Sequence, residues 1–240
     1  MSRCVSIFIL LFLAAFSHQA DAQNIYLLSV GVADYPGDRN DLVLPAEDAK
    51  AIYELFKKNG KVTASLLTDS KATRKAIVAS AESLFQKAEK DDIVIFFFSG
   101  HGERRGFCAY DGILKYSSIR RVFSKCKAAN KMIFADSCLS GALREVSKDH
   151  YRDPNNNIML FLSSRSNELS NEAIYMKNGY FTTCLLRALR GGADTDRDRI
   201  ITAKELFVSV SKSVTTLSKD SQHPVMWGNF DDNMPVMVWK

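Results

Sequence analysis

The chain has 240 residues, of which 46% are apolar, so it can form one sizeable folded domain. It carries 32 Lys and Arg residues against 27 Asp and Glu, a net charge of +5, and these charges are interspersed rather than gathered into a basic stripe. This pattern argues against a nucleic-acid partner. Only four of the five cysteines follow residue 22, which is too few for a fold stabilised mainly by disulfides.

The first 22 residues are typical of a secretory signal peptide. Arg3 precedes an apolar run from Val5 to Phe16, and Ala20-Asp21-Ala22 is a small-residue cleavage pattern. The run is shorter than the roughly 20 apolar residues that span a bilayer, although an N-terminal membrane anchor is the alternative. We expect export to the periplasm or the extracellular space, and a single domain over 23–240 with no membrane span in the mature chain.

Apolar runs alternate with amphipathic segments along 23–240, which is typical of a mostly parallel sheet with helices on both faces. Segment 222–228 is expected to be a loop. Apolar periodicity predicts helices over 45–58, 73–90, 179–189 and 202–217. The apolar runs predict strands at 25–32, 62–67, 92–98, 131–135, 158–163 and 234–239.

Two predicted strands end in small residues that carry one reactive side chain each. The first runs into Ser99-Gly100-His101-Gly102, and the second into Asp136-Ser137-Cys138-Leu139-Ser140-Gly141. Ligands of open α/β sheets bind at the carboxyl ends of strands, so both side chains should emerge at one edge. A lone cysteine or histidine is more often structural, but a thiol and an imidazole placed together indicate a nucleophile and its acid–base partner.

Two further expectations accompany this pair. Backbone N–H groups of Gly102 and Cys138 are candidates for an oxyanion hole. No third member of a catalytic triad is evident, so backbone carbonyls are expected to orient the imidazole.

These motifs resemble the dyad motifs of the caspase–hemoglobinase peptidases of clan CD, most of all bacterial caspase-like and metacaspase members. The resemblance covers most of 25–230, and it implies a six-stranded, mainly parallel sheet flanked by helices. It makes His101 the acid–base residue and Cys138 the nucleophile of a cysteine endopeptidase that acts on proteins or peptides. It also includes Gly31-Val32-Ala33-Asp34-Tyr35-Pro36, Leu44-Pro45-Ala46-Glu47-Asp48-Ala49 and Leu162-Ser163-Ser164-Arg165.

The chain departs from caspases in the narrow sense. Their signature has Gln-Ala-Cys, with the histidine roughly 50 residues upstream. Here the residues are Asp136-Ser137-Cys138, and His101 lies 37 residues upstream.

The residue two positions before the nucleophile predicts the cleavage specificity. By the resemblance, an aspartate at position 136 accepts a basic substrate side chain, because a carboxylate in a pocket selects Arg or Lys by a charge-assisted pair. Alternatively, Asp136 only hydrogen-bonds backbone at the strand end. Arg39 and Arg165 lie roughly where caspases place the arginines that bind aspartate, so acidic specificity is a second alternative. We expect cleavage after Arg or Lys.

The polar segment 144–157 joins the Cys138 strand to the next apolar strand, and long loops inside compact domains are usually functional or mobile. It corresponds to the region that many family members cut during maturation. We therefore expect self-cleavage after Arg144, Lys148 or Arg152, with an ordinary surface loop as the alternative.

Two other classes of function stay open. One is a non-catalytic caspase-fold module that binds partners or peptides. The other is a thiol amidase or transpeptidase on the same fold.

The dyad needs no cofactor, but one acidic segment has the spacing of a calcium loop. Asp194, Asp196, Asp198 and Glu205 occupy positions 1, 3, 5 and 12 of a twelve-residue frame, as in an EF-hand. Position 6 is Arg199, where the sharp turn favours glycine. The alternative is an acidic turn stabilised only by the dipole of the following helix. The spacing therefore predicts a Ca²⁺ site in addition to the peptidase dyad.

Overall fold

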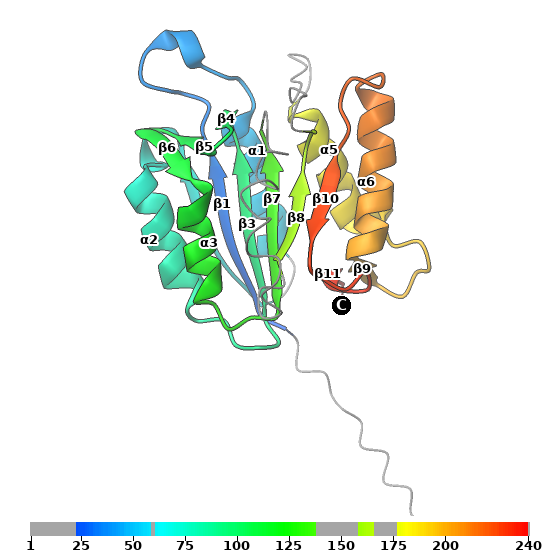
Figure 1. The fold of residues 1–240 in the computed structure, drawn as a ribbon. Coiled ribbons are helices and arrows are strands. Elements are labelled where there is room, and N and C mark those ends of the chain that lie inside the picture. Colours follow the sequence, from blue (N-terminus) through cyan, green and yellow to red (C-terminus); the bar gives the residue numbers. More distant parts are fainter. Residues whose placement is uncertain (1–22, 59–60, 138–157, 166–176, 240) are drawn as a thin grey trace, which may run out of the picture.

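The structure, a computed structural model, describes residues 23–58, 61–137, 158–165 and 177–239. A six-stranded sheet in the order β10-β8-β7-β3-β1-β2 forms its centre (Figure 1). Five of these strands are parallel, and β10 runs antiparallel to β8, so the predicted α/β sheet is confirmed. The strands are β1 (Ile25–Gly31), β2 (Val62–Thr68), β3 (Ile93–Ser99), β7 (Asn130–Asp136), β8 (Ile158–Leu162) and β10 (Val225–Gly228).

Helices cover both faces of the sheet (Figure 1). On one face lie α1 (Pro45–Lys57), α5 (Tyr180–Arg187) and α6 (Ala203–Leu217), and on the other α2 (Arg74–Phe85) and α3 (Tyr116–Ser124). Because β3 lies between two helical layers, it is buried along its whole length, and successive residues contribute to opposite cores. No helix in the described part of the chain is long and apolar enough to cross a membrane.

The end of the chain differs from the sequence prediction. Residues 234–239 contain β11 (Pro235–Val238), but this strand pairs with β9 (Ile200–Thr202) in a separate two-stranded sheet. The sixth strand of the central sheet is β10, so the prediction of a loop over 222–228 was wrong. β10 has only four residues and ends at Gly228, too short a segment for a periodic pattern to be recognised.

A small antiparallel sheet directly follows His101. It consists of β4 (Gly102–Glu103), β5 (Gly106–Ala109) and β6 (Gly112–Lys115), and it leads into α3. Fully buried Phe107 stacks on Phe98 of β3 with ring centroids 4.5 Å apart, and it meets Tyr116 edge-on at 4.9 Å. These ring contacts fasten the small sheet to the α2–α3 core, so the chain on the far side of His101 is anchored.

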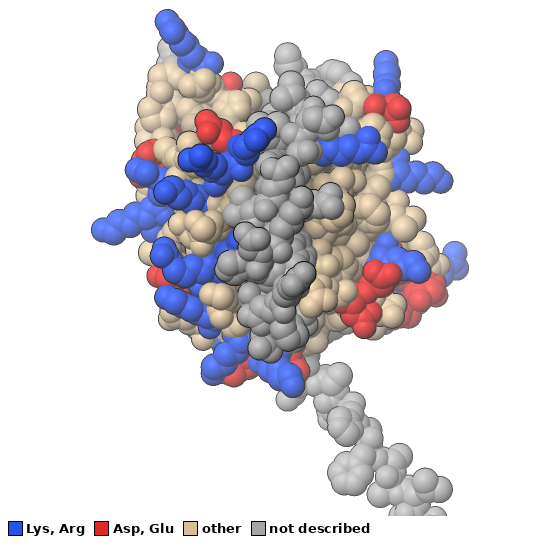
Figure 2. All heavy atoms as spheres, in the orientation of Figure 1, with Lys and Arg blue, Asp and Glu red and all other residues tan. Residues whose placement is uncertain are grey.

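Charged side chains are distributed unevenly over the surface. Figure 2 shows many Lys and Arg side chains on the half that carries α2 and α3, and acidic side chains at the corner that carries β9 and β11. Several basic residues on the first half have acidic partners, in the ion pairs Arg74–Asp111, Lys125–Glu82 and Lys127–Glu89. These pairs are exposed and therefore contribute little to stability.

Candidate active site

The parallel strands β3 and β7 are paired so that the two motifs leave the sheet at the same position along the strands. Ser99, the last residue of β3, lies opposite Asp136, the last residue of β7. His101 follows Ser99 by two residues, and Cys138 follows Asp136 by two residues. The backbone N–H of Gly100 donates to the carbonyl of Asp136 at 3.2 Å. The two predicted dyad residues therefore follow neighbouring strand ends in register, although Cys138 itself lies outside the described residues.

The half-buried imidazole of His101 lies against a backbone carbonyl. Its Nε2 atom is 2.9 Å from the carbonyl oxygen of Asn40, in the segment between β1 and α1. A carbonyl only accepts hydrogen bonds, so this contact requires the proton on Nε2 and leaves Nδ1 of the neutral ring free as a base. Gly102 begins β4 immediately after His101. Its role in an oxyanion hole stays a prediction.

Asp136 is almost completely buried, with 7% of its surface exposed. Its Oδ2 atom accepts hydrogen bonds from the backbone N–H of Thr182 at 3.1 Å and from the Thr182 hydroxyl at 2.8 Å. Thr182 lies in the first turn of α5, where N–H groups are free to bind anions. The structure therefore holds the Asp136 carboxylate at a helix N-terminus, where its negative charge is favoured.

Asp48 is the residue of this site that the sequence prediction missed. It lies on α1, is 2% exposed, and accepts hydrogen bonds from the Ser99 hydroxyl at 2.8 Å and the Gly179 N–H at 3.1 Å. Asn178 donates to it as well, at 2.9 Å. The sequence held a signal for it, because position 48 falls on the same helix face as buried Pro45 and Ile52. An acid on an apolar stripe is a candidate functional group.

The two buried carboxylates lie on either side of Gly179. A β-carbon at this position would be 2.8 Å from Oδ2 of Asp136 and 3.4 Å from Oδ2 of Asp48. Burial, and after it the negative charge of Asp136, raise the pKa of Asp48 to about 8, although three hydrogen bonds favour its ionised form. At neutral pH the pair therefore retains a proton. None of the ion pairs between described residues involves Asp48.

Close packing of α1 on β1 brings Asp48 to the sheet edge. A β-carbon on Gly31, the last residue of β1, would be 2.1 Å from the carbonyl oxygen of Pro45 and 2.8 Å from Cβ of Ala49. The hydroxyl of Ser29 donates to the Ala49 carbonyl at 2.8 Å. Glycine is therefore required at position 31 for α1 to approach closely enough.

A buried hydroxyl fixes the residue before Cys138. The Ser163 hydroxyl accepts from the N–H of Ser137 at 3.2 Å and donates to its carbonyl at 3.3 Å. Gln222, which is fully buried, donates from Nε2 to the Ser163 carbonyl at 2.9 Å. These contacts hold the peptide groups of Ser137 in place.

The remaining predicted site residues have different surroundings. Arg39 is exposed, in a short 3₁₀ turn after β1, and Arg165 is exposed, shortly after β8. Arg144, Lys148 and Arg152 lie outside the described residues. Within the described part of the chain no disulfide joins Cys108, Cys126 or Cys184 to another cysteine, and burial raises the pKa of Cys126 and of Cys184, the latter to about 11.

The predicted calcium loop brings together three of its four acidic residues. Carboxylate oxygens of Asp194, Asp196 and Asp198 lie within 4.8 Å of one another, and Oδ1 of Asp194 is buried without a hydrogen-bond partner. Arg199 adopts a φ of 70°, so the turn forms without the glycine expected at position 6. These three carboxylates fit a hard cation.

The fourth predicted ligand has other partners. Oε1 of Glu205 accepts from Thr195, and Oε2 accepts from Thr202, in the capping box of α6. Burial raises the pKa of Glu205, but these hydrogen bonds outweigh it and lower the pKa to about 2. Calcium binding therefore stays a prediction, and it would require Glu205 to exchange partners.

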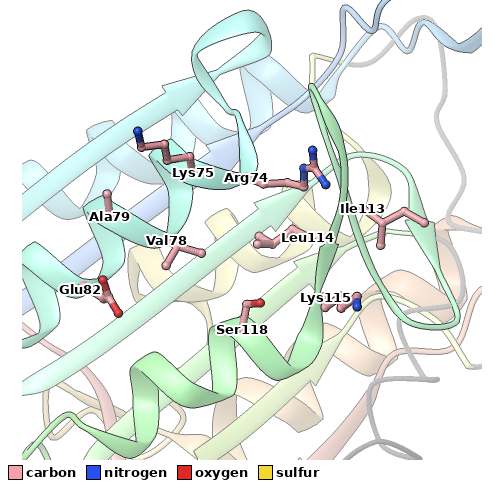
Figure 3. A pocket seen from close by; sticks show the side chains of 9 residues that line it. All are labelled: Arg74, Lys75, Val78, Ala79, Glu82, Ile113, Leu114, Lys115 and Ser118. Carbon is pink, nitrogen blue, oxygen red and sulfur yellow. The ribbon is translucent and has the colours of Figure 1, made fainter.

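A groove of about 430 Å³ between α2, β6 and α3 shares no residue with this site (Figure 3). Val78 and Leu114 contribute apolar surface to it, and Arg74 and Glu82 stand at its edge (Figure 3). Both of these charged residues already have ion-pair partners. We assign it no part in the chemistry.

A doubly covered parallel sheet with a histidine loop and a cysteine loop on adjacent strands defines a caspase-type α/β protein. Residues 26–234 match the family model of the caspase domain, and the chain therefore belongs to the caspase-domain peptidase family within the caspase–hemoglobinase superfamily. No curated protein matches the chain.

Solved structures show the same fold. A Geobacter sulfurreducens protein solved as a structural genomics target is 18% identical, with a TM-score of 0.68 over 90% of this chain and 100% of its own. Caspase-1 from Spodoptera frugiperda is 18% identical, with a TM-score of 0.66 over 91% of this chain and 90% of its own. At this identity the likeness concerns the fold alone.

The raised pKa of Asp48 predicts a specific pH dependence of stability. Between its ordinary pKa of 3.8 and about 8, Asp48 is protonated in the folded chain and ionised in the unfolded chain, so unfolding releases a proton. The free energy of unfolding should therefore fall as pH rises through this window. In Asp48→Asn this contribution is absent, so the difference between wild type and variant, measured by urea denaturation, should shrink with rising pH.

The adjacent residue offers a matched control. Glu47 is exposed and pairs with Lys50 on the same helix, so Glu47→Gln should show no such trend. A constant difference between wild type and Asp48→Asn from about pH 5 to pH 8 would contradict the raised pKa.

Calcium binding is tested by thermal unfolding. With Ca²⁺ at about 100 times its dissociation constant, a bound ion stabilises the fold by about 2.7 kcal/mol, a rise in Tm of roughly 5–10 °C for a chain of this size. Asp196→Ala should abolish the rise, whereas Asp91→Ala, at an exposed position elsewhere, should retain it. Absence of any Ca²⁺ effect on the wild type would exclude the site.

Proposed function

We propose that this protein is an exported cysteine endopeptidase that cleaves after Arg or Lys through His101 and Cys138. The observation that carries the specificity is the buried pair of carboxylates, Asp48 and Asp136. Both are bonded to elements that also hold the dyad motifs: Ser99 donates to Asp48 and precedes His101 by two residues, while Asp136 precedes Cys138 by two. A substrate side chain that reaches this pair lies beside the reacting groups.

A basic side chain supplies the positive charge that the buried carboxylate pair lacks. Burial and, after it, the negative charge of Asp136 oppose the ionisation of Asp48, so the pair keeps a proton at neutral pH. A guanidinium or ammonium group between them replaces the proton and forms charge-assisted hydrogen bonds. An acidic side chain would instead add a further negative charge beside the pair. The pair therefore favours Arg or Lys.

The proposed chemistry follows from the free Nδ1 atom of His101. This nitrogen takes the proton of the Cys138 thiol as sulfur bonds to the scissile carbonyl carbon. It then gives that proton to the leaving amine while the C–N bond breaks. Water, deprotonated by the same imidazole, hydrolyses the thioester and restores the thiol. The contact between Nε2 and the Asn40 carbonyl stabilises the imidazolium that forms in each step.

Acidic specificity is the alternative that Arg39 and Arg165 would support. Both are exposed, whereas the two carboxylates are buried close to the dyad motifs. Exposed cations are screened by water and select an anion less strongly than a buried pair selects a cation. The geometry therefore favours basic specificity.

A panel of fluorogenic peptides ending in Arg, Lys, Asp or Asn tests the specificity. Wild type should hydrolyse the Arg and Lys peptides, and Cys138→Ala should hydrolyse none. Asp136→Asn and Asp48→Asn should lower kcat/KM on the Arg peptide by about 30-fold or more, because truncating one partner of a buried charged pair costs about 2–5 kcal/mol. Glu47→Gln is the matched control and should retain activity.

Each result of the peptide panel supports or contradicts one part of the proposal. Preferential hydrolysis of the Asp peptide would replace basic by acidic specificity. Hydrolysis that persists in Cys138→Ala would overturn the mechanism, and no hydrolysis of any peptide by wild type would favour a binding module. Repeating the panel with Ca²⁺ shows whether the ion affects activity.

Self-cleavage is the second activity that we propose. Segment 144–157 offers Arg144, Lys148 and Arg152, all residues of the proposed specificity. Mass spectrometry of purified wild type should find fragments that end at one of these residues, and Cys138→Ala should remain intact. The same fragments in Cys138→Ala would assign the cleavage to another protease.

The proposal that the protein is exported rests on the signal-peptide pattern of residues 1–22, which lie outside the described residues. N-terminal sequencing of the exported protein should find a start near Gln23. A retained apolar segment would support the membrane-anchor alternative.

A further inference from the structure

The loop between β1 and α1 touches His101 at two points. The Tyr35 hydroxyl accepts a hydrogen bond from the backbone N–H of His101 at 2.9 Å, and the Asn40 carbonyl lies 2.9 Å from the imidazole Nε2. The rings of Tyr35 and His101 are in contact, with centroids 5.1 Å apart and planes tilted by 41°. One loop therefore contacts both the backbone and the reactive ring of the histidine.

Hydrogen bonds hold this loop in a fixed shape. Oδ1 of Asp69, from the turn after β2, accepts from the N–H groups of Ala33 and Asp34 at 2.9 and 3.1 Å. Oδ1 of Asp41 accepts from the N–H of Tyr35 at 2.9 Å. The N–H of Leu42 donates to the carbonyl of Ala33 at 2.9 Å and closes the loop. These bonds therefore fix the positions of the Tyr35 hydroxyl and the Asn40 carbonyl, the two groups of the loop that contact His101.

The Tyr35 hydroxyl closes a ring of hydrogen bonds around the His101 backbone. It donates to the carbonyl of Cys108 at 3.2 Å, and the N–H of Cys108 donates to the carbonyl of His101 at 2.9 Å. Tyr35 is 7% exposed, so water has little access to replace these bonds. Both backbone polar groups of His101 are bonded within this ring.

Gly100 leaves the space that the hydroxyl occupies. A β-carbon on Gly100 would be 2.8 Å from Oη of Tyr35 and 3.1 Å from the carbonyl oxygen of Val32. Its φ of 147° is also one that other residues rarely adopt. The strand end and the tyrosine are therefore matched in shape as well as in hydrogen bonding.

We propose that Tyr35 is a positioning residue for the reaction, acting through His101. Its hydroxyl fixes the backbone of His101, so that the imidazole meets the Asn40 carbonyl with Nε2 and Nδ1 is left to act as the base. This role rests on the proposed peptidase function, in which Nδ1 accepts the proton of Cys138. Small displacements of a reacting group lower rates steeply, by about 100-fold for 1 Å.

Tyr35→Phe tests the proposal, because it removes the hydroxyl and keeps the ring beside the imidazole. We expect kcat on the Arg peptide to fall by about 10- to 100-fold with little change in KM. The acid limb of the pH profile of kcat/KM should shift, because the imidazole of His101 is no longer held against the Asn40 carbonyl. Tyr26→Phe is the matched control, since the Tyr26 hydroxyl bonds the exposed carbonyl of Lys87 at 3.3 Å, away from His101.

A second measurement does not depend on peptide hydrolysis. The rate at which iodoacetamide alkylates Cys138, followed by mass spectrometry as a function of pH, reports how well His101 stabilises the thiolate. In Tyr35→Phe the profile should move to higher pH. Asp41→Ala, which frees the N–H of Tyr35 at an exposed position, should shift it in the same direction.

The outcomes separate this proposal from the peptidase function. An unchanged kcat and an unchanged alkylation profile in Tyr35→Phe would overturn the positioning role. A fall in kcat accompanied by a lower Tm and an unshifted alkylation profile would also overturn it, as general loosening of the fold. If wild type hydrolyses no peptide, the peptidase proposal fails, and the alkylation profiles still decide whether Tyr35 positions His101.

Discussion

The burial of Asp48 next to Asp136 is the constraint on which the arrangement of this protein depends. Neighbouring carboxylates in a buried environment are unfavourable unless hydrogen bonds and a shared proton compensate. The compensation comes from three parts of the chain: the end of β3 through Ser99, the segment before α5 through Asn178 and Gly179, and α5 itself through Thr182. α1 and β7 supply the carboxylates. The carboxylate pair therefore ties the sheet edge to two helices.

Around this pair, each predicted catalytic loop is held by groups from other elements. The His101 loop is bonded to the β1–α1 loop and to β5, and Ser137, which precedes Cys138, is bonded to Ser163. Rigid surroundings of this kind keep reacting groups in place without reorganisation during the reaction. Close packing at this edge of the sheet also explains three glycines, since Gly31, Gly100 and Gly179 each face an atom closer than a β-carbon allows.

Much of the fold could be predicted from the sequence, for a physical reason. The strands β1, β3, β7 and β8 are buried along almost their whole length, so apolar residues dominate their sequences, and the small polar residues that end β3 and β7 mark the site. The three short strands after His101 and the strand β10 escaped prediction because each is four residues long or shorter and lacks a clear alternation. Short strands owe their structure to their neighbours rather than to their own pattern.

The site was predicted in part, from residues that follow strands. Asp48 was missed because its importance arises from tertiary contacts: only the packing of α1 against β1 brings it to Ser99 and Gly179. The calcium loop illustrates the opposite case. Its spacing was recognised in the sequence, but the partners of Glu205 became evident only in three dimensions.

The absence of a side chain at Gly179 has a consequence for how the proposed specificity could change during evolution. Because Asp48 and Asp136 both lie against this glycine, and the charge of Asp136 helps to raise the pKa of Asp48, neither position is independent of the other. Neutralising Asp136 alone removes the repulsion that helps to raise the pKa of Asp48, and leaves a buried carboxylate that ionises more readily and must still be satisfied. A larger residue at position 179 would collide with Asp136 instead. A new preference therefore requires concerted substitutions on α1, on β7 and before α5, so the intermediates along that route are constrained by stability as well as by catalysis.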